Sequence, residues 1–231
     1  MTSDTEQGAG TTPSGVVRIY LADDHAVFRD GLRLLLEAEP DITVVGDAAE
    51  GRKAAAEVEA LRPDVVVLDI GMPGLNGIEA ARRIRERCPD AGMVILSMHG
   101  TSEHIYQALS AGAQAYVLKE SAGTEVVEAI RSVMAGRRYL SRKISDVVVE
   151  DYLGDRNFRE PRSPIANLTH REREVLQLVV EGRSSREIAS MVHLSPKTVD
   201  TYRCRLMQKL GVQDIPALVK FCIRHGITPQ A

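Results

Sequence analysis

The sequence predicts a two-domain chain, in which a doubly wound α/β domain with a five-stranded parallel sheet precedes a small all-α domain of four helices. Apolar runs of strand length alternate with amphipathic helical stretches over residues 16–137. From 168 to 226 the apolar periodicity is helical throughout. A length of 231 residues also suits two domains better than one. Residues 1–15 are polar, so we expect a disordered tail there and not a signal peptide.

The first domain is defined by its regular alternation of strands and helices. We expect strands at 16–22, 42–46, 65–69, 93–97 and 115–119, and helices near 27–38, 51–61, 76–87, 102–111 and 123–135. Asn76 and Ser102 are the expected N-caps of two of these helices. The alternation implies right-handed crossovers and a doubly wound parallel sheet, for which we expect the flavodoxin-like order 2-1-3-4-5. No Gly-rich phosphate loop follows the first strand, which argues against a dinucleotide or P-loop site.

Composition excludes several classes of function. A net charge of -3 and a pI near 6.1 argue against a wholly basic nucleic-acid binder. No apolar run approaches the roughly 18 residues of a membrane span, so we expect no membrane partner. Three cysteines without CxxC spacing argue against a disulfide framework and against a zinc site. We therefore expect a cytoplasmic protein with reduced thiols.

Several predicted strand ends carry the residue types of a phosphoryl-transfer site. Asp69 ends the third strand, Asp23 and Asp24 follow the first, Ser97 ends the fourth and Lys119 the fifth. Because ligands collect outside the carboxyl ends of parallel strands, we expect these side chains to meet at one edge. Clustered carboxylates repel one another unless a cation neutralises them, and oxygen ligands favour Mg²⁺. Cation, ammonium and hydroxyl together suit a phosphoryl group, with one carboxylate as the nucleophile.

Simpler interpretations exist for each residue alone. An isolated strand-end aspartate is more often a helix N-cap, Lys119 alone is a solvated charge, and Tyr116 alone is core packing. Their joint occurrence at matching strand ends favours the site. An aspartate-nucleophile phosphatase is an alternative from another class. Such enzymes generally carry a second acidic residue two positions after the nucleophile, where this chain has Gly71.

At these residues roughly 120 residues of the chain resemble the receiver domain of two-component response regulators. The family pattern is an acidic pair, a phosphoacceptor Asp before a Gly/Pro turn, a Ser or Thr, and a Lys three residues after an aromatic. The resemblance implies that Asp69 accepts a phosphoryl group from a sensor histidine kinase and that the protein turns over no substrate of its own. The implied magnesium ligands are Asp23, Asp24, Asp69 and Gly71. The implied phosphoryl-binding and switch residues are Ser97, Tyr116 and Lys119.

A linker is expected at 138–167, with a helix at 144–153 and a polar, Pro-containing tether after it. The helical domain follows at 168–226. Thr169 is placed to cap its first helix, Ser184 or Ser185 to begin the second, and Ser195 to cap the third ahead of a proline. Two helices joined by a short turn within such a bundle are the helix-turn-helix pattern.

The third helix of this domain, ending before Gly211, has an apolar and a polar face. Between 168 and 225 ten Lys and Arg stand against six Asp and Glu, a net of +4, which leaves -7 for the rest of the chain. This asymmetry suits a DNA-binding module. On periodicity alone a basic, solvated helix face is an equal alternative, and a protein-binding adaptor is another.

Resemblance to the LuxR-type helix-turn-helix of the NarL/FixJ class is carried by the stretch LTHREREVLQLVVEGRSSREIASMVHLSPKTVDTYRCRLMQKLGV. It implies binding to a double-stranded DNA operator as a homodimer, with the unphosphorylated receiver blocking the helix-turn-helix until phosphorylation. The expected DNA-facing residues are Lys197, Thr198, Asp200, Thr201, Cys204, Arg205 and Gln208. An apolar stripe on the fourth helix is either a dimer face or ordinary core packing. Its members are Ile215, Leu218, Val219 and Cys222.

Overall fold

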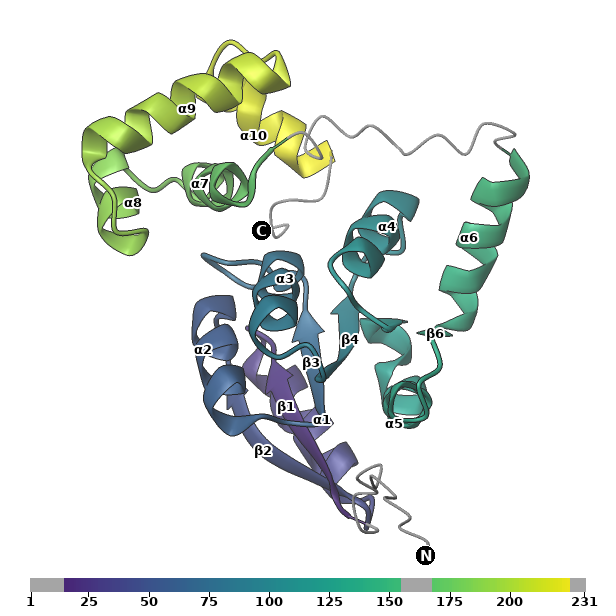
Figure 1. Cartoon of the computed structure of the whole chain (residues 1–231). Helices are drawn as coiled ribbons and strands as arrows, with labels where there is room; N and C mark the ends of the chain where they lie inside the picture. Colours follow the sequence, from purple (N-terminus) through teal and green to yellow (C-terminus); the bar gives the residue numbers. More distant parts are fainter. Residues whose placement is uncertain (1–14, 155–167, 225–231) are drawn as a thin grey trace, which may run out of the picture.

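The structure, a computed structural model, describes residues 15–154 and 168–224 of the chain (Figure 1). They form an α/β domain followed by a helical domain, as the sequence predicts. The expected polar tether after 154 lies outside the described residues, and so does the expected N-terminal tail except for its last residue. No helix among the described residues is long and apolar enough to cross a membrane.

A parallel sheet of six strands, in the order β2-β1-β3-β4-β5-β6, forms the centre of the first domain. The strands are β1 (Val17–Ala22), β2 (Ile42–Ala48), β3 (Val65–Asp69), β4 (Gly92–Ser97), β5 (Ala115–Leu118) and β6 (Tyr139–Leu140). The predicted order of the first five is confirmed. The prediction of five strands is wrong by one, because β6 has only two residues and is too short to show a strand pattern in the sequence.

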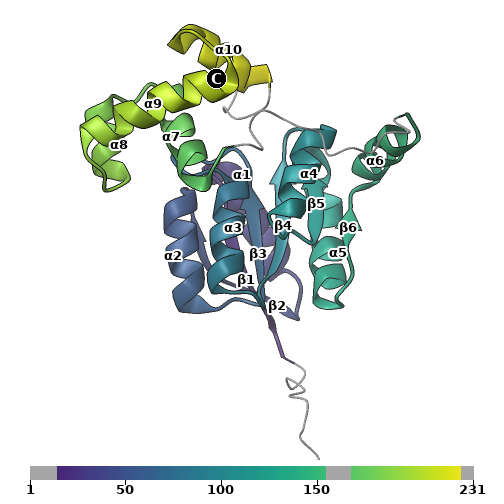
Figure 2. The ribbon, with the colours of Figure 1, turned by 45° about the horizontal axis from the view of Figure 1, so that its top comes forward.

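Helices cover both faces of this sheet (Figure 2). They are α1 (Ala26–Glu37), α2 (Gly51–Leu61), α3 (Gly77–Arg87), α4 (Ser102–Ser110) and α5 (Ala122–Met134), with α6 (Arg142–Gly154) after β6. The central strand β3 shows why its sequence is apolar throughout. Val65 and Val67 pack in the same cluster as side chains of α1 and α5, whereas Val66 and Leu68 pack with α2, α3 and α4. A strand buried on both faces needs no alternation of polar residues.

Two helix starts define the loops at the carboxyl edge of the sheet. Asn76 caps α3 as predicted, because its side chain accepts a hydrogen bond of 2.9 Å from the Glu79 amide. The predicted cap Ser102 is wrong. Thr101 has the extended backbone of an N-cap and accepts from the His104 amide at 3.5 Å, while Ser102 is already helical. The loop between β4 and α4 is therefore residues 98–101.

The helical domain consists of α7 (His170–Val180), α8 (Ser185–Met191), α9 (Pro196–Leu210) and α10 (Ile215–Arg224) around a core of its own. Thr169 and Ser184 form complete capping boxes at the starts of α7 and α8. Ser195 caps α9 ahead of its first-turn proline, and Gly211 ends it with a φ of 66°. The predicted caps of α7, α8 and α9 and the predicted end of α9 at Gly211 are confirmed.

We predict that Gly77→Ala destabilises the first domain. A Cβ at Gly77 would lie 2.0 Å from the main-chain oxygen of Asp69, so α3 and the end of β3 would have to separate. The expected reduction in unfolding free energy is about 1–3 kcal/mol. Gly31→Ala in α1 is the control, because a Cβ there meets no heavy atom within 4 Å and the helix gains propensity. Urea unfolding followed by circular dichroism measures both, and equal midpoints for the two variants would contradict the prediction.

Candidate functional site

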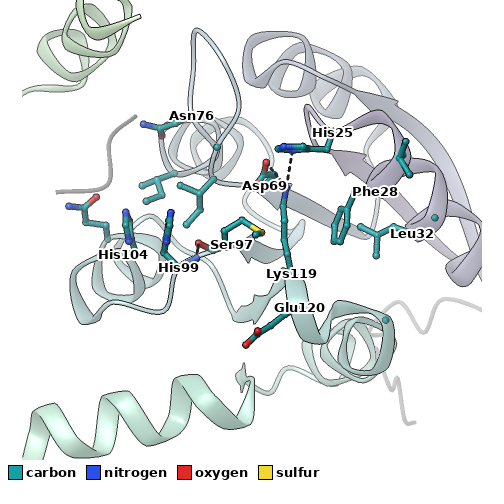
Figure 3. Close-up of a pocket in the computed structure, with 18 of the residues that line it drawn as sticks. His25, Phe28, Leu32, Asp69, Asn76, Ser97, His99, His104, Lys119 and Glu120 are labelled. Carbon is teal, nitrogen blue, oxygen red and sulfur yellow. Dashed lines mark hydrogen bonds and ion pairs between the residues drawn. The ribbon is translucent and has the colours of Figure 1, made fainter. Parts of the chain in front are cut away.

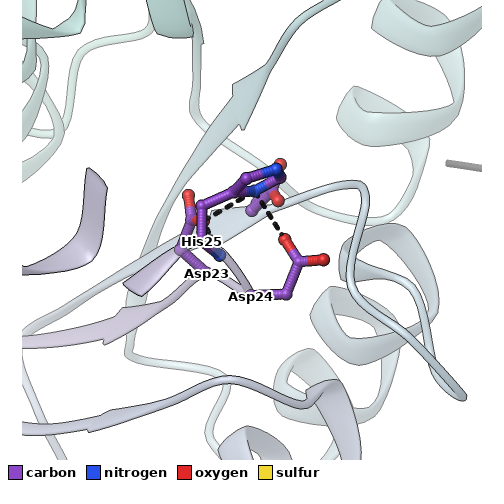
Figure 4. A group of neighbouring side chains, drawn as sticks. Asp23, Asp24 and His25 are labelled. Carbon is purple, nitrogen blue, oxygen red and sulfur yellow. Dashed lines mark hydrogen bonds and ion pairs between the residues drawn. The ribbon is translucent and has the colours of Figure 1, made fainter. Parts of the chain in front are cut away.

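Three carboxylates meet at the carboxyl edge of the sheet, as the strand ends predict. Asp23 and Asp24 follow β1, and Asp69 is the last residue of β3. Asp23 and Asp69 are only 1% and 3% exposed. Oxygen atoms of all three and a ring nitrogen of His25 lie within 4.8 Å of one another (Figure 4). Burial raises the pKa of Asp23 and of Asp69, and the neighbouring carboxylates raise both further.

Lys119 supplies the positive charge of this cluster. It begins a single 3-10 turn, η1 (Lys119–Ser121), directly after β5, and is 8% exposed. Its ammonium lies 2.8 Å from a carboxylate oxygen of Asp23. It is also 2.8 Å from a carboxylate oxygen of Asp69 (Figure 3). Burial lowers the pKa of Lys119, but the two carboxylates raise it by more, so it stands above its usual value. The lysine is therefore charged and shared between both acids.

His25 belongs to this cluster, which its place in the sequence did not reveal. Its Nδ1 atom lies 2.8 Å from Asp24 and 3.4 Å from Asp23 and from the Lys119 ammonium. No ligand spacing marks this histidine. The available signal was only its position immediately after an acidic strand end.

The donor set of the cluster fits a hard divalent cation. Carboxylate oxygens are the ligands that Mg²⁺ prefers, and three of them converge here. Gly71, in the loop after β3, lies next to them: its amide is hydrogen-bonded to Asp69, and a Cβ placed on it would be 3.5 Å from an Asp69 oxygen. Each predicted magnesium ligand is thus at or beside the cluster.

Ser97 and Tyr116 both hold the loop between β4 and α4. Ser97, 2% exposed at the end of β4, accepts a hydrogen bond of 3.0 Å from the His99 amide. The hydroxyl of the fully buried Tyr116 donates to the His99 carbonyl at 2.6 Å. Burial raises the pKa of Tyr116, and its hydrogen bond with Ser97 opposes that shift. The two predicted switch residues therefore bind the two main-chain polar groups of one loop residue, His99, beside the carboxylates.

A cavity of about 1060 Å³ is lined by Asp69, Lys119 and Ser97, and residues of α1 form part of its wall (Figure 3). Its wall on α1 is apolar and includes Val27, which is 88% exposed, and the half-buried Phe28. The acidic cluster is thus reached beside a surface on which apolar groups of another molecule can pack.

The polar face of α9 is open to solvent. Every predicted DNA-facing residue is exposed or half-buried. These residues are Lys197, Thr198, Asp200, Thr201, Cys204, Arg205 and Gln208. The opposite face of α9 buries Val199, Leu206 and Leu210 in the domain core, as predicted. One expected DNA contact has a partner within the domain, since Asp200 accepts a hydrogen bond of 2.6 Å from Ser185.

The apolar stripe of α10 contributes to the core of the helical domain. Leu218 is 1% and Cys222 0% exposed, and both belong to the central cluster. Burial raises the pKa of the Cys222 thiol to about 12. Ile215 and Val219 are half-buried. Of the two interpretations that spacing left open, core packing is the one that holds for Leu218 and Cys222.

The first domain binds α7 through buried carboxylates. Glu174 of α7, 2% exposed, pairs with Arg52 of α2 and, at 3.1 Å, with Arg83 of α3. It also pairs with Arg171 of its own helix at 2.7 Å. Burial raises the pKa of Glu174, but the three arginines lower it by more, so it stands below its usual value. No pattern in the sequence indicates this contact.

A second buried acid and two loop contacts extend this interface. Glu79 of α3 accepts a hydrogen bond of 3.1 Å from Arg173 of α7. Gln177, 3% exposed, donates to the Met72 carbonyl at 3.1 Å, in the loop that follows Asp69. The Gly74 amide of the same loop donates to Glu181 at 2.9 Å. The loop after β3 therefore connects the carboxylate cluster directly to the helical domain.

Two protein-family models match the chain. One, described as the response regulator receiver domain, matches residues 19–131. The other, described as bacterial regulatory proteins of the luxR family, matches residues 166–222. The first match contains the carboxylate cluster and the second contains α7 to α9.

Similar proteins span both domains. The chain is 36% identical over 212 residues to the response regulator UvrY of Escherichia coli (strain K12), covering 92% of this chain and 96% of that protein. It is 35% identical over 222 residues to the transcriptional regulatory protein DegU of Brevibacillus brevis, covering 91% and 94%. It is 39% identical over 198 residues to the DNA-binding transcriptional activator DevR/DosR of Mycobacterium tuberculosis, covering 86% and 90%.

Solved structures agree with these matches. RcsB from Salmonella enterica serovar Typhimurium, bound to a promoter in the presence of the phosphomimetic BeF3−, superposes with a TM-score of 0.62 at 25% identity, covering 90% of this chain and 98% of that one. A LuxR-family two-component response regulator from Aurantimonas superposes with a TM-score of 0.58 at 40% identity, covering 60% of this chain and 99% of that one.

Proposed function

This chain belongs to the two-component transcriptional response regulators that join a receiver domain to a LuxR-type DNA-binding domain, and we propose that phosphoryl transfer from a sensor histidine kinase to Asp69 controls its binding to operator DNA. The observation that carries this proposal is the buried Asp69 carboxylate, 2.8 Å from the Lys119 ammonium and beside two further carboxylates. In the transfer, the P–N bond to the kinase histidine breaks as a P–O bond to an Asp69 oxygen forms. Because the kinase histidine and the operator are both met in the cytoplasm, we propose the same location for this chain.

We assign a Mg²⁺ site to four donors. They are the carboxylates of Asp23, Asp24 and Asp69 and the main-chain carbonyl of Gly71. An ion bound there would neutralise the clustered acids and the phosphoryl oxygens. His25 offers a softer nitrogen donor, so we assign it no metal role. Lys119 leaves its present pairing with Asp69 to hold a phosphoryl oxygen.

The switch pair acts through its present hydrogen bonds. The Ser97 hydroxyl, which accepts from the His99 amide here, turns to donate to a phosphoryl oxygen on Asp69. Tyr116 follows the loop because its hydroxyl is bonded to the His99 carbonyl. Phosphorylation is thereby converted into a movement of the loop between β4 and α4.

The kinase reaches Asp69 across the α1 wall of the cavity. Val27 is 88% exposed there, and an apolar residue so exposed at the mouth of a buried site fits contact with a protein partner. DNA is read by α9, whose polar face is open. The homodimer on DNA that we propose uses the half-buried Ile215 and Val219 of α10, because Leu218 and Cys222 are committed to the core.

Docking of α7 is the restraint that we propose for the unphosphorylated chain. The receiver holds α7 through Arg52 and Arg83, while the polar face of α9 stays exposed. The restraint therefore acts on the position of the DNA-binding domain and not by covering its base-reading surface. A domain fixed to its own receiver is not free to take the place that paired half-sites require.

Asp69→Asn should abolish labelling by acetyl phosphate, since the variant has no nucleophilic carboxylate oxygen. Asp24→Ala or removal of Mg²⁺ by EDTA should also stop labelling, because the acids are left without their neutralising ion. Asp90→Asn, on an exposed turn, is the matched control and should label like the wild type. Incorporation of labelled phosphate measures all four, and undiminished labelling of Asp69→Asn would refute the assignment.

Val27→Glu should slow phosphoryl transfer from the kinase while leaving labelling by acetyl phosphate unchanged. The variant places a charge on the apolar wall that only a protein donor contacts. Transfer rates from the two donors, compared for this variant and the wild type, test the docking. If the ratio of the rate with the kinase to the rate with acetyl phosphate is the same for the variant and the wild type, the kinase docks elsewhere.

Substitutions on α9 should separate positioning from base reading. Lys197→Ala and Arg205→Ala should weaken binding to all sequences and lower the salt slope by about one unit or less, because they meet phosphates. Thr201→Ala and Cys204→Ala should instead change which sequence is preferred, at about 1–3 kcal/mol for each well-formed base contact that the substitution removes. Binding is measured by fluorescence anisotropy on operator and scrambled DNA at several salt concentrations. Variants that bind every DNA like the wild type would show that α9 is not the recognition helix.

The double variant Arg52→Ala/Arg83→Ala should bind operator DNA more tightly than the wild type when both are unphosphorylated. It removes the receiver's two partners of Glu174 and leaves Arg171 to satisfy that acid. Coupling of about 1–3 kcal/mol corresponds to an increase of about five- to 150-fold. Lys53→Ala on the exposed side of α2 is the control.

A fragment beginning near Pro164 gives the upper limit of that affinity, because it has no receiver. Equal binding by the fragment and the unphosphorylated full chain, at one salt concentration, would eliminate the restraint and leave both domain assignments intact.

A further inference from the structure

The segment after α5 is built into the first domain although neither family match includes it. Those matches cover residues 19–131 and 166–222, whereas β6 and α6 span 139–154. β6 pairs with β5, and the Ser141 amide donates to the main-chain carbonyl of Tyr116 at 3.0 Å. The chain that leaves the receiver is thus hydrogen-bonded to the strand that carries the switch tyrosine.

Ile144, in the first turn of α6, packs against the loop between β4 and α4. Its side chain is 0% exposed and lies in the same core cluster as Tyr116 and Leu118. A Cβ placed on Gly100 of the loop would be 2.8 Å from the Ile144 Cδ1 atom and 3.6 Å from Leu118. The Ile144 side chain therefore fills the space into which a side chain at position 100 would project.

The same loop is held on its other side by the switch pair. Ser97 and Tyr116 bind the amide and the carbonyl of His99, and Gly100 is the next residue. On the side of α6 the loop is packed against the fully buried Ile144, whereas Met98 and His99 line the open cavity beside Asp69, so the free space for a movement of the loop lies away from Ile144. Displacement of His99 has to alter the contact between Gly100 and Ile144.

We propose that Ile144 is a positioning residue of the phosphorylation switch and that α6 reports the state of Asp69 to the connection with the DNA-binding domain. The inference rests on the function proposed above. When Ser97 turns to the phosphoryl group it gives up the His99 amide, the loop shifts, and the surface on which Ile144 docks α6 moves away. Docked α6 thus favours the unphosphorylated loop. By reciprocity, a weaker contact at Ile144 favours the phosphorylated state.

The first test is the affinity of the full chain for beryllofluoride, a phosphoryl mimic, at fixed Mg²⁺, measured by fluorine NMR titration. Ile144→Ala should bind it about fivefold more tightly or better, the lower end of typical coupling. Ile144→Leu, which keeps the buried volume, should bind beryllofluoride with the affinity of the wild type. Val149→Ala is the control, because Val149 is on the same helix and 53% exposed. Equal affinity of Ile144→Ala and the wild type would overturn the proposal.

A second test uses substitutions too small to prevent folding. Gly100→Ala forces its new methyl against Ile144 Cδ1 and should tighten beryllofluoride binding by displacing α6. Ile144→Val removes that same Cδ1 atom, so Gly100→Ala/Ile144→Val should bind more like the wild type than Gly100→Ala does. Strictly additive effects in this double-mutant cycle would show that the two residues do not act on each other.

Hydrogen exchange of the α6 amides gives the direct readout. Beryllofluoride with Mg²⁺ should speed exchange in residues 145–150 of the wild type and leave Asp69→Asn unchanged. Beryllofluoride that fails to bind the wild type would contradict the function proposed for Asp69. Binding that leaves exchange in α6 unchanged would contradict only the role of α6.

Discussion

The paired contact of Lys119 with Asp23 and Asp69 is the interaction on which the rest of this structure depends. Burial raises the pKa of Asp23 and of Asp69 and favours their neutral forms, and a neighbouring carboxylate raises each further, Asp69 that of Asp23 and Asp24 that of Asp69. The single Lys119 ammonium, 2.8 Å from a carboxylate oxygen of each, favours their charged forms, which the proposed roles as metal ligands and nucleophile require. Because the three residues come from the ends of β1, β3 and β5, the cluster exists only when the sheet is complete. The chemistry is thereby tied to the fold of the receiver.

This dependence explains how much of the site the sequence predicts. All strands of a parallel sheet end at one edge, so chemistry-bearing residues at strand ends are brought together without knowledge of loop geometry. Asp23, Asp69, Ser97 and Lys119 follow that rule. His25 does not, because its ring reaches the cluster through the turn before α1. Period and spacing carry no information about the direction of such a turn.

Contacts between distant segments were beyond the sequence for a different reason. Glu79 and Arg173 are 94 positions apart, and each alone is indistinguishable from a solvated helix charge. Only the docking of α7 on α3 turns them into a partly buried pair. The stripe on α10 shows the opposite case, in which the sequence offered two uses of one pattern. The four-helix bundle decides between them, because without Leu218 and Cys222 its small core would be open.

Asp69 has two routes to the helical domain, and they begin at neighbouring strands. The loop after β3 contacts α7 through the Met72 carbonyl and the Gly74 amide. The loop after β4 contacts α6 through Gly100. Under the proposed function, a phosphoryl group on Asp69 sits between these loops and acts both on the docked domain and on α6. The free energies of two couplings in the same direction add, so their effects on an equilibrium constant multiply. In the proposed switch, a local change of hydrogen bonds is thereby sufficient to release a whole domain.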